Sequence, residues 1–147
     1  MLAQAIKRRL SKEENQKGFT LIELLAVIVI LGIIAVIAIP MIGNIVTNSR
    51  ENADLATARQ IYEAARLYVI GEQNGNFSTN TSVTLATLQT ANYIDVGLVL
   101  PSTKLPLTPA STIVTFNTDG VLQTVVLTPN PAGVTNGSYA ASVILTK

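Results

Sequence analysis

The apolar run from Phe19 to Ile39 contains only two strongly polar side chains, Thr20 and Glu23. As a helix that rises 1.5 Å per residue, the run spans about 31 Å, close to the ~30 Å hydrocarbon core of a bilayer. A carboxylate in such a helix opposes membrane insertion by roughly 2.5–3.5 kcal/mol at the helix centre and by less near its ends. The run therefore predicts a membrane-spanning helix in which Glu23 needs a partner.

The charged residues are distributed unevenly on the two sides of this run. The segment 1–18 carries five basic and two acidic side chains, and the rest of the chain carries five basic and seven acidic ones. Basic residues next to a membrane span stay on the cytoplasmic side. We therefore expect a single-pass precursor in the cytoplasmic membrane, with its N-terminus inside and its acidic body outside.

The composition argues against catalytic chemistry. The chain has no Cys and no His, so it lacks a thiolate nucleophile, the side chain best suited to proton transfer at neutral pH and the usual ligands of transition metals. Asp95 and Asp119 are the only carboxylates after Glu72, and two acids do not make a calcium loop. We expect no catalytic, cofactor-binding or metal-binding residue, no small-molecule substrate and no enzyme activity.

Nucleic-acid binding has little support in the sequence. Proteins that bind nucleic acids directly carry basic patches or recognisable binding motifs. Here the one basic cluster lies within residues 7–17, and no phosphate-binding loop is present. We therefore do not expect the body of the chain to bind nucleic acid by itself.

Three interpretations of the apolar run differ in what they explain. A cleaved secretory signal has an apolar core of about 7–15 residues and a small-residue cleavage site, whereas here the core is longer and Pro40-Met41-Ile42 follows it. An ordinary single-span anchor explains the length but not Glu23. A span that later leaves the membrane to form the core of an assembly explains both features.

The residues around Glu23 match a known signal. Residues 17–25 read KGFTLIELL, with a basic leader before them and a long apolar run after them. This pattern resembles the class III signal of type IV prepilins and related pseudopilins; the resemblance covers residues 17–66 well and the rest of the chain in outline. It implies that a prepilin peptidase cuts between Gly18 and Phe19 on the cytoplasmic side, and that Phe19 becomes N-methylated.

The resemblance also implies a partner for Glu23. Cleavage frees an amine on Phe19, and in related filaments the carboxylate neutralises the amine of an adjacent subunit. Either charge alone is costly to bury, so unmatched subunits are disfavoured. The alternative is that Glu23 stays hydrated near the cytoplasmic interface and has no role in assembly.

Gly32 and Pro40 lie where the family commonly has a helix glycine and a kinking proline. Gly lowers helix propensity by about 1 kcal/mol relative to Ala, and Pro removes a helix hydrogen bond. We therefore expect a helix that bends or loosens at these residues. For Gly32, close packing of helices within the membrane is the alternative.

A helical pattern continues beyond Pro40. Apolar residues recur every three to four positions up to Tyr68, which predicts one amphipathic helix from Phe19 to about Gly71. Charged residues interleave with them, and pairs such as Asp54 with Arg59 are expected at the surface, where they contribute little to stability.

The remainder of the chain predicts a small mixed head. After a polar segment that ends the long helix, residues 84–93 predict a short helix with Thr84 as its cap. Three prolines make residues 98–110 a loop or at most an edge strand. Period-two patterns then predict strands at residues 112–116, 121–128 and 138–146, the first two joined by a turn in which Gly120 takes the left-handed position.

The predicted fold class is therefore α+β, with a long N-terminal α-helix packed against a small antiparallel β-sheet of about three strands, as in the type IV pilin fold. Its segments are a cytoplasmic leader that is removed (1–18), a transmembrane and filament-core helix (19–40), an amphipathic continuation of that helix (41–72), and a globular head (73–147) with a short helix (84–93) and a sheet (112–146).

The expected function is that of a structural subunit precursor of a type IV pilus or pilus-like filament, cleaved after Gly18 and polymerised through its N-terminal helix. Its expected partners are other copies in a helical filament, the prepilin peptidase, the cytoplasmic membrane and the pilus assembly machinery, with the processed subunit at the cell surface. A competence or type II secretion pseudopilin is the first alternative. A monomeric bitopic membrane protein with an extracytoplasmic binding domain is the second.

Overall fold

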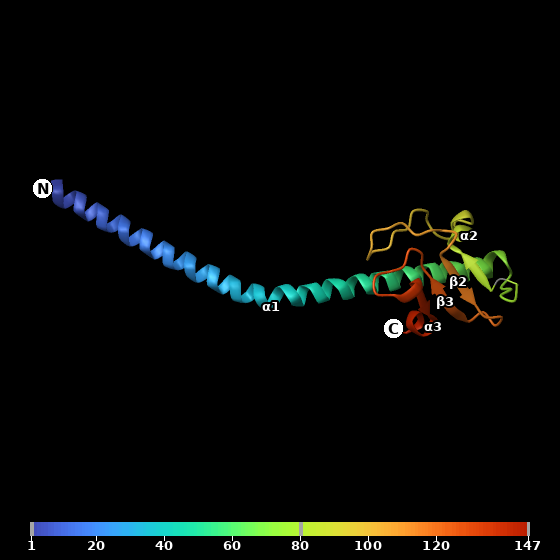
Figure 1. The fold of residues 1–147 in the computed structure, drawn as a ribbon. Helices are drawn as coiled ribbons and strands as arrows, with labels where there is room; N and C mark the ends of the chain where they lie inside the picture. Colours follow the sequence, from blue (N-terminus) through green and yellow to red (C-terminus); the bar gives the residue numbers. More distant parts are fainter. Residues whose placement is uncertain (1, 80, 147) are drawn as a thin grey trace. The chain divides into compact units, whose positions relative to one another are not determined.

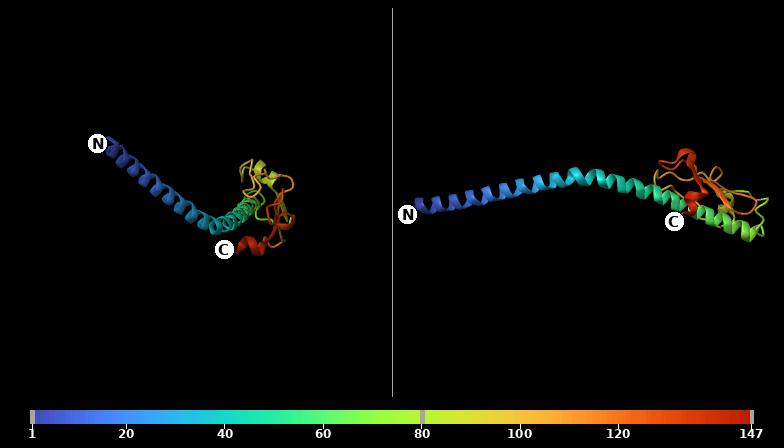
Figure 2. Two further views of the ribbon diagram at one scale, coloured as in Figure 1. Left: turned by 60° about the vertical axis from the view of Figure 1, so that its left-hand side comes forward. Right: turned by 90° about the horizontal axis from the view of Figure 1, so that it is seen from below.

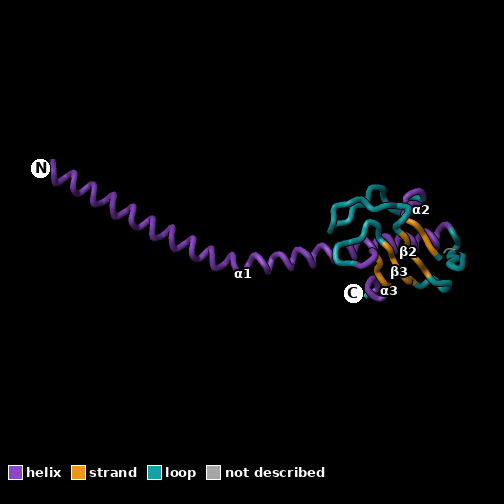
Figure 3. The backbone as a smooth tube through the Cα atoms, viewed as in Figure 1, coloured by secondary structure: helices purple, strands orange, loops and turns teal. Residues whose placement is uncertain are grey.

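The computed structural model describes residues 2–79 and 81–146; for residues 10–19 it describes the helical backbone but not the side chains. The described chain divides into two units, one ending at Ile45 and the other beginning at Val46. We describe each unit by itself. Figure 1 labels α1, α2, α3, β2 and β3, and Figure 3 colours the helices, strands and loops by type.

Helix α1 (Leu2–Glu72) runs through both units, and Pro40 lies inside it. In the first unit nearly all described side chains are exposed, including the large apolar residues from Leu21 to Ile45. The part of α1 from Thr20 onward is the one helix among the described residues that is long and apolar enough to cross a membrane. A contiguous exposed apolar surface of this size needs a cover of lipid or of other chains.

In the second unit, α1 has one buried face. The buried residues recur every three to four positions, as expected for an amphipathic helix against a core. They are Asp54, Ala58, Ile61, Tyr62, Ala64, Ala65 and Val69. The predicted amphipathic C-terminal half of the long helix is therefore confirmed.

The strands form a four-stranded antiparallel sheet in the order β1-β2-β3-β4. The sheet lies along this part of α1 (Figure 2). The α+β class is thus confirmed, but the sheet has four strands where about three were predicted. The strands are β1 (Ser82–Thr84), β2 (Ile113–Phe116), β3 (Leu122–Val126) and β4 (Ser138–Ala140).

One row of side chains crosses all four strands and forms the centre of the core. Val83 pairs with Val114, Val114 with Val125, and Val125 with Tyr139. All four residues are buried. Because side chains on one face of a sheet alternate with period two, this register places the whole row on the face that is buried against the core.

The ends of the sheet differ from the prediction. The strand predicted at 138–146 stops at Ala140, and its second half is helix α3 (Ala141–Leu145). Helix α2 (Leu85–Thr90) is shorter than the predicted 84–93, although Thr84 caps it as expected by accepting a hydrogen bond from the Thr87 amide at 3.3 Å. A short 3-10 turn, η1 (Thr135–Gly137), precedes β4.

The turns follow their residue chemistry. Gly120 has φ +79° and closes the β2–β3 turn, as predicted, with its amide donating to the Asn117 carbonyl at 3.0 Å. The proline-rich loop over residues 98–110 contains a single antiparallel bridge between Val99 and Pro106. This loop returns to α1, where the Ser102 amide donates a hydrogen bond to Asp54.

Candidate functional site

Glu23 is exposed on α1 within the apolar segment. It forms no hydrogen bond or ion pair with any side chain that the structure describes. Phe19 lies about one helical turn away along the backbone, but the side chains of Gly18 and Phe19 are outside the described residues. The cleavage site, the methylated Phe19 and its pairing with Glu23 therefore stay predictions.

Gly32 and Pro40 both lie inside the uninterrupted helix α1. A Cβ added at Gly32 would meet no atom within 4 Å, so the helix surface there is open in the single chain. An open glycine surface suits either predicted role, the close approach of another helix or local flexibility. Flexibility at these two residues stays a prediction.

Asp54 is the only buried charged side chain among the described residues, with 0% exposure. Its Oδ1 accepts the Ser102 amide hydrogen at 3.0 Å, and Ser102 Oγ in turn accepts the Ala132 amide at 3.2 Å. One carboxylate on α1 thus fixes the proline-rich loop, and that loop holds a second loop before η1. The predicted surface pair of Asp54 with Arg59 is wrong, because Asp54 points into the head.

Three buried oxygen atoms near this anchor have no hydrogen-bond partner among the described residues: Asp54 Oδ2, Thr103 Oγ1 and Tyr139 Oη. Burial, and then the negative charges of Asp54 and Glu51, raise the pKa of Tyr139 to about 12. The phenol therefore stays protonated near neutral pH.

Arg59 holds the C-terminal segment against α1. Its Nε donates to the Ile144 carbonyl at 2.7 Å, and its Nη2 donates to the Thr146 carbonyl. These carbonyls lie at the end of α3, where a helix has no backbone donors of its own for them. Local sequence patterns do not predict this contact, because the bonded residues lie 85 and 87 positions apart.

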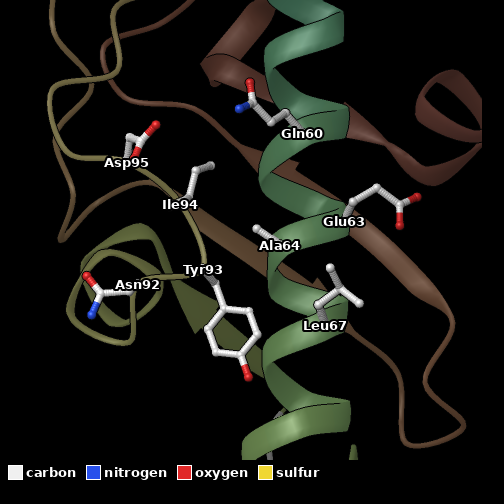
Figure 4. Close-up of a pocket in the computed structure, with 8 residues that line it drawn as sticks. All are labelled: Gln60, Glu63, Ala64, Leu67, Asn92, Tyr93, Ile94 and Asp95. Carbon is white, nitrogen blue, oxygen red and sulfur yellow. The ribbon is translucent and has the colours of Figure 1, made fainter.

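A groove of about 330 Å³ lies between α1 and the segment after α2 (Figure 4). Glu63 and Leu67 come from α1, whereas Tyr93 and Asp95 come from the opposite segment. Tyr93 is held by its hydroxyl, which donates to Glu72 Oε1 at 3.3 Å. Burial and the Glu72 carboxylate raise the pKa of Tyr93. Acidic and apolar groups thus share one surface depression.

No group of three or more His, Cys, Asp or Glu side chains that suits a metal ion occurs in the described part of the chain. The distinctive chemical features of the described chain are therefore the lone carboxylate in the apolar helix, the Asp54 anchor and the acidic groove. The first of them was predicted from the sequence, and the other two were not.

Comparison with known proteins bears on the N-terminal segment. Residues 15–39 match the family model of the prokaryotic N-terminal methylation motif. The chain carries a prokaryotic N-terminal methylation motif. The matched residues include the predicted cleavage site, Glu23 and Gly32, and they cover the whole apolar run.

The chain is also similar to curated pilins. It is 37% identical over 76 residues to a type IV major alpha-pilin of Moraxella bovis, which is 47% of this chain and 48% of that protein. It is 38% identical over 60 residues to a type IV major fimbrial protein FimA of Dichelobacter nodosus, an alignment that covers 41% of this chain and 38% of that protein. It is 41% identical over 61 residues to a second FimA of Dichelobacter nodosus, with 41% of this chain and 39% of that protein covered. The chain thus spans less than half the length of these relatives. No solved structure matches it significantly.

Proposed function

We propose that this chain is the precursor of a structural subunit of a type IV pilus or pilus-like filament. The observation that carries the proposal is the methylation motif, which coincides with an exposed apolar helix containing a single carboxylate. The relatives are named as major pilin and major fimbrial proteins, which favours a pilus over a competence or secretion pseudopilus. The subunit then acts by assembly and not by catalysis.

Processing creates the group that the membrane helix lacks. A prepilin peptidase hydrolyses the Gly18–Phe19 bond on the cytoplasmic side, which releases the leader and leaves an ammonium group on Phe19. That group is then N-methylated. When a subunit moves from the membrane into the filament, the Glu23 carboxylate of one copy neutralises the Phe19 ammonium of its neighbour. In a low-dielectric filament core, either charge without the other is strongly unfavourable.

The exposed apolar surface of α1 supplies the remaining driving force. In the single chain the large side chains from Leu21 to Ile45 have no cover, and lipid covers them before assembly. In the filament, helices of other copies replace the lipid and pack closely at small residues such as Gly32. Contacts between unlike surfaces of successive copies generate an open helical filament.

Substitution of Glu23 tests this function. For Glu23→Gln, which keeps the size of the side chain, we expect normal cleavage but a loss of filaments of more than about 100-fold, because breaking a buried ion pair costs about 3–5 kcal/mol. Filaments sheared from cells are quantified by immunoblot, and the N-terminus of the membrane-bound subunit is measured by mass spectrometry. Glu23→Asp, which keeps the charge, is the matched control. Normal filament yield from Glu23→Gln would contradict the charge-matching role.

A further inference from the structure

The groove in the second unit combines two kinds of surface (Figure 4). It is lined by the buried Ala64 and Ile94 and the exposed Leu67, and the exposed carboxylates of Glu63 and Asp95 lie on opposite sides of it and point away from each other (Figure 4). Neither carboxylate forms a hydrogen bond or ion pair with a described residue. The groove therefore presents unpaired negative charge beside apolar side chains.

This combination suits a lysine side chain. Lysine has an apolar four-carbon stem that packs along apolar surface and a terminal ammonium with three hydrogen-bond donors. The carboxylates supply opposite charge, and the amides of Gln60 and Asn92, which also line the groove, supply further acceptor oxygens. An anionic ligand would instead be repelled by Glu63 and Asp95.

Lys104 has the features expected of the matching group. It is exposed, it lies at the tip of the proline-rich loop, and its ammonium has no partner among the described residues. Its φ is +60°, a left-handed conformation that costs a non-glycine residue about 1–2 kcal/mol. An exposed residue in such a conformation, whose ammonium has no partner among the described residues, is a candidate for a function that needs its side chain.

The loop also presents Lys104 on a rigid base. The Lys104 amide donates to the Leu100 carbonyl at 2.9 Å, and the Ser102 amide is fixed to the buried Asp54. Because little of this loop has to be ordered when it binds, an intermolecular contact loses less conformational entropy.

We propose that Lys104 of one copy of this chain binds in the acidic groove of a second copy. The loop is fixed at the level of Asp54, and the groove is centred near Ala64, about 15 Å further along α1 at 1.5 Å per residue. A second copy displaced along the helix by that distance brings its Lys104 to the groove of the first. The contact joins unlike surfaces, so it repeats from copy to copy. The proposal rests on the filament function proposed above.

The test separates assembly from folding. Lys104→Gly removes the side chain and relieves the left-handed strain, so we expect the full chain in detergent to unfold at an equal or higher temperature while sheared filaments fall about two- to fivefold. Lys104→Arg keeps the charge and should assemble nearly normally. Lys104→Glu should lower the yield further, and Asp95→Lys in the same chain should restore at least half of it, because the two charges are exchanged.

The outcomes distinguish the two proposals. Suppose that the unsubstituted chain assembles. A normal filament yield from Lys104→Gly would then overturn the groove contact and leave the filament function intact. Failure of Asp95→Lys to restore filaments in the Lys104→Glu chain would do the same. An unsubstituted chain that is never cleaved at Gly18 and forms no filaments would overturn both. The chain has no Cys, so an introduced cysteine pair can be tested directly. A disulfide-linked dimer that forms only when Lys104→Cys and Asp95→Cys chains are mixed would independently support the groove contact.

Discussion

Removing the Arg59 side chain should release the C-terminal segment from α1. The Nε bond to the Ile144 carbonyl is partly buried, and hydrogen bonds from charged donors contribute about 1.5–3 kcal/mol. The Nη2 bond to the Thr146 carbonyl is exposed and adds less. We therefore expect Arg59→Ala to lower the free energy of unfolding of the segment by about 2–3 kcal/mol.

Local opening of the segment is the direct readout. Helix α3 has five residues, too few for a helix to be stable by itself, so its order depends on Arg59 and on the buried Ile144. The expected change corresponds to exchange about 30–150-fold faster for the amide hydrogens of residues 141–146. Hydrogen exchange measured by mass spectrometry on the full chain in detergent micelles checks this expectation.

Two variants make the result specific. Arg66→Ala removes an exposed arginine of the same helix that forms no hydrogen bond with a described residue, and it should leave exchange at residues 141–146 unchanged. Arg59→Lys keeps the charge but supplies a single nitrogen, so its effect should be intermediate. If Arg59→Ala and Arg66→Ala give the same exchange rates, the assignment of Arg59 as the group that holds the C-terminal segment is wrong.

Two further predictions concern the head. Gly137→Ala should destabilise the head by roughly 3 kcal/mol, since Gly137 has φ +63° and an added Cβ would lie 2.2 Å from the Leu127 carbonyl oxygen. The control Gly75→Ala should cost only about 1 kcal/mol, because Gly75 has φ +73° but open space around it. Equal melting temperatures of the two variants would contradict the predicted difference. Because the pKa of Tyr139 is raised to about 12 in the folded chain, against about 10 in the unfolded chain, the stability that it contributes is complete below pH 10 and is lost as the pH rises through 12. Tyr139→Phe should therefore lose less stability over this range than the unsubstituted chain in denaturant titrations; parallel losses would refute it.

The sequence predicted the features that depend on local patterns. The apolar run, the helical period beyond Pro40 and the turn at Gly120 are each specified by neighbouring residues, and the structure contains all three. The α2 cap at Thr84 was predictable for the same reason, because capping requires only a suitable side chain close in sequence to the amide from which it accepts.

Features that depend on distant partners were missed. Strand β1 is short, lies next to a polar segment and is defined by its pairing with β2, which follows only after α2 and the proline-rich loop. The pattern that predicted a strand at 138–146 continues into α3, whose last carbonyls bind Arg59. Asp54 resembles a surface charge in the sequence, and its burial follows from a bond to the Ser102 amide, 48 positions away. Local sequence patterns do not predict these long-range contacts.

The candidate sites also differ in whether local sequence patterns predict them. The methylation motif is a continuous string, so the roles of Gly18, Phe19 and Glu23 could be predicted from the sequence, and the matched range 15–39 includes these residues. The acidic groove combines α1 with a segment that follows α2. Because its two sides come from separate parts of the chain, only the folded head brings Glu63 and Asp95 to one surface.

The most direct test of the account is the N-terminal residue of the subunit in filaments sheared from the cell surface. Mass spectrometry of the purified filaments should show a chain that begins at N-methylated Phe19, which would establish cleavage after Gly18, export and assembly in one measurement. A surface filament whose subunits retain Met1 and the basic leader would contradict the account, as would a chain found only as an intact monomer in the membrane.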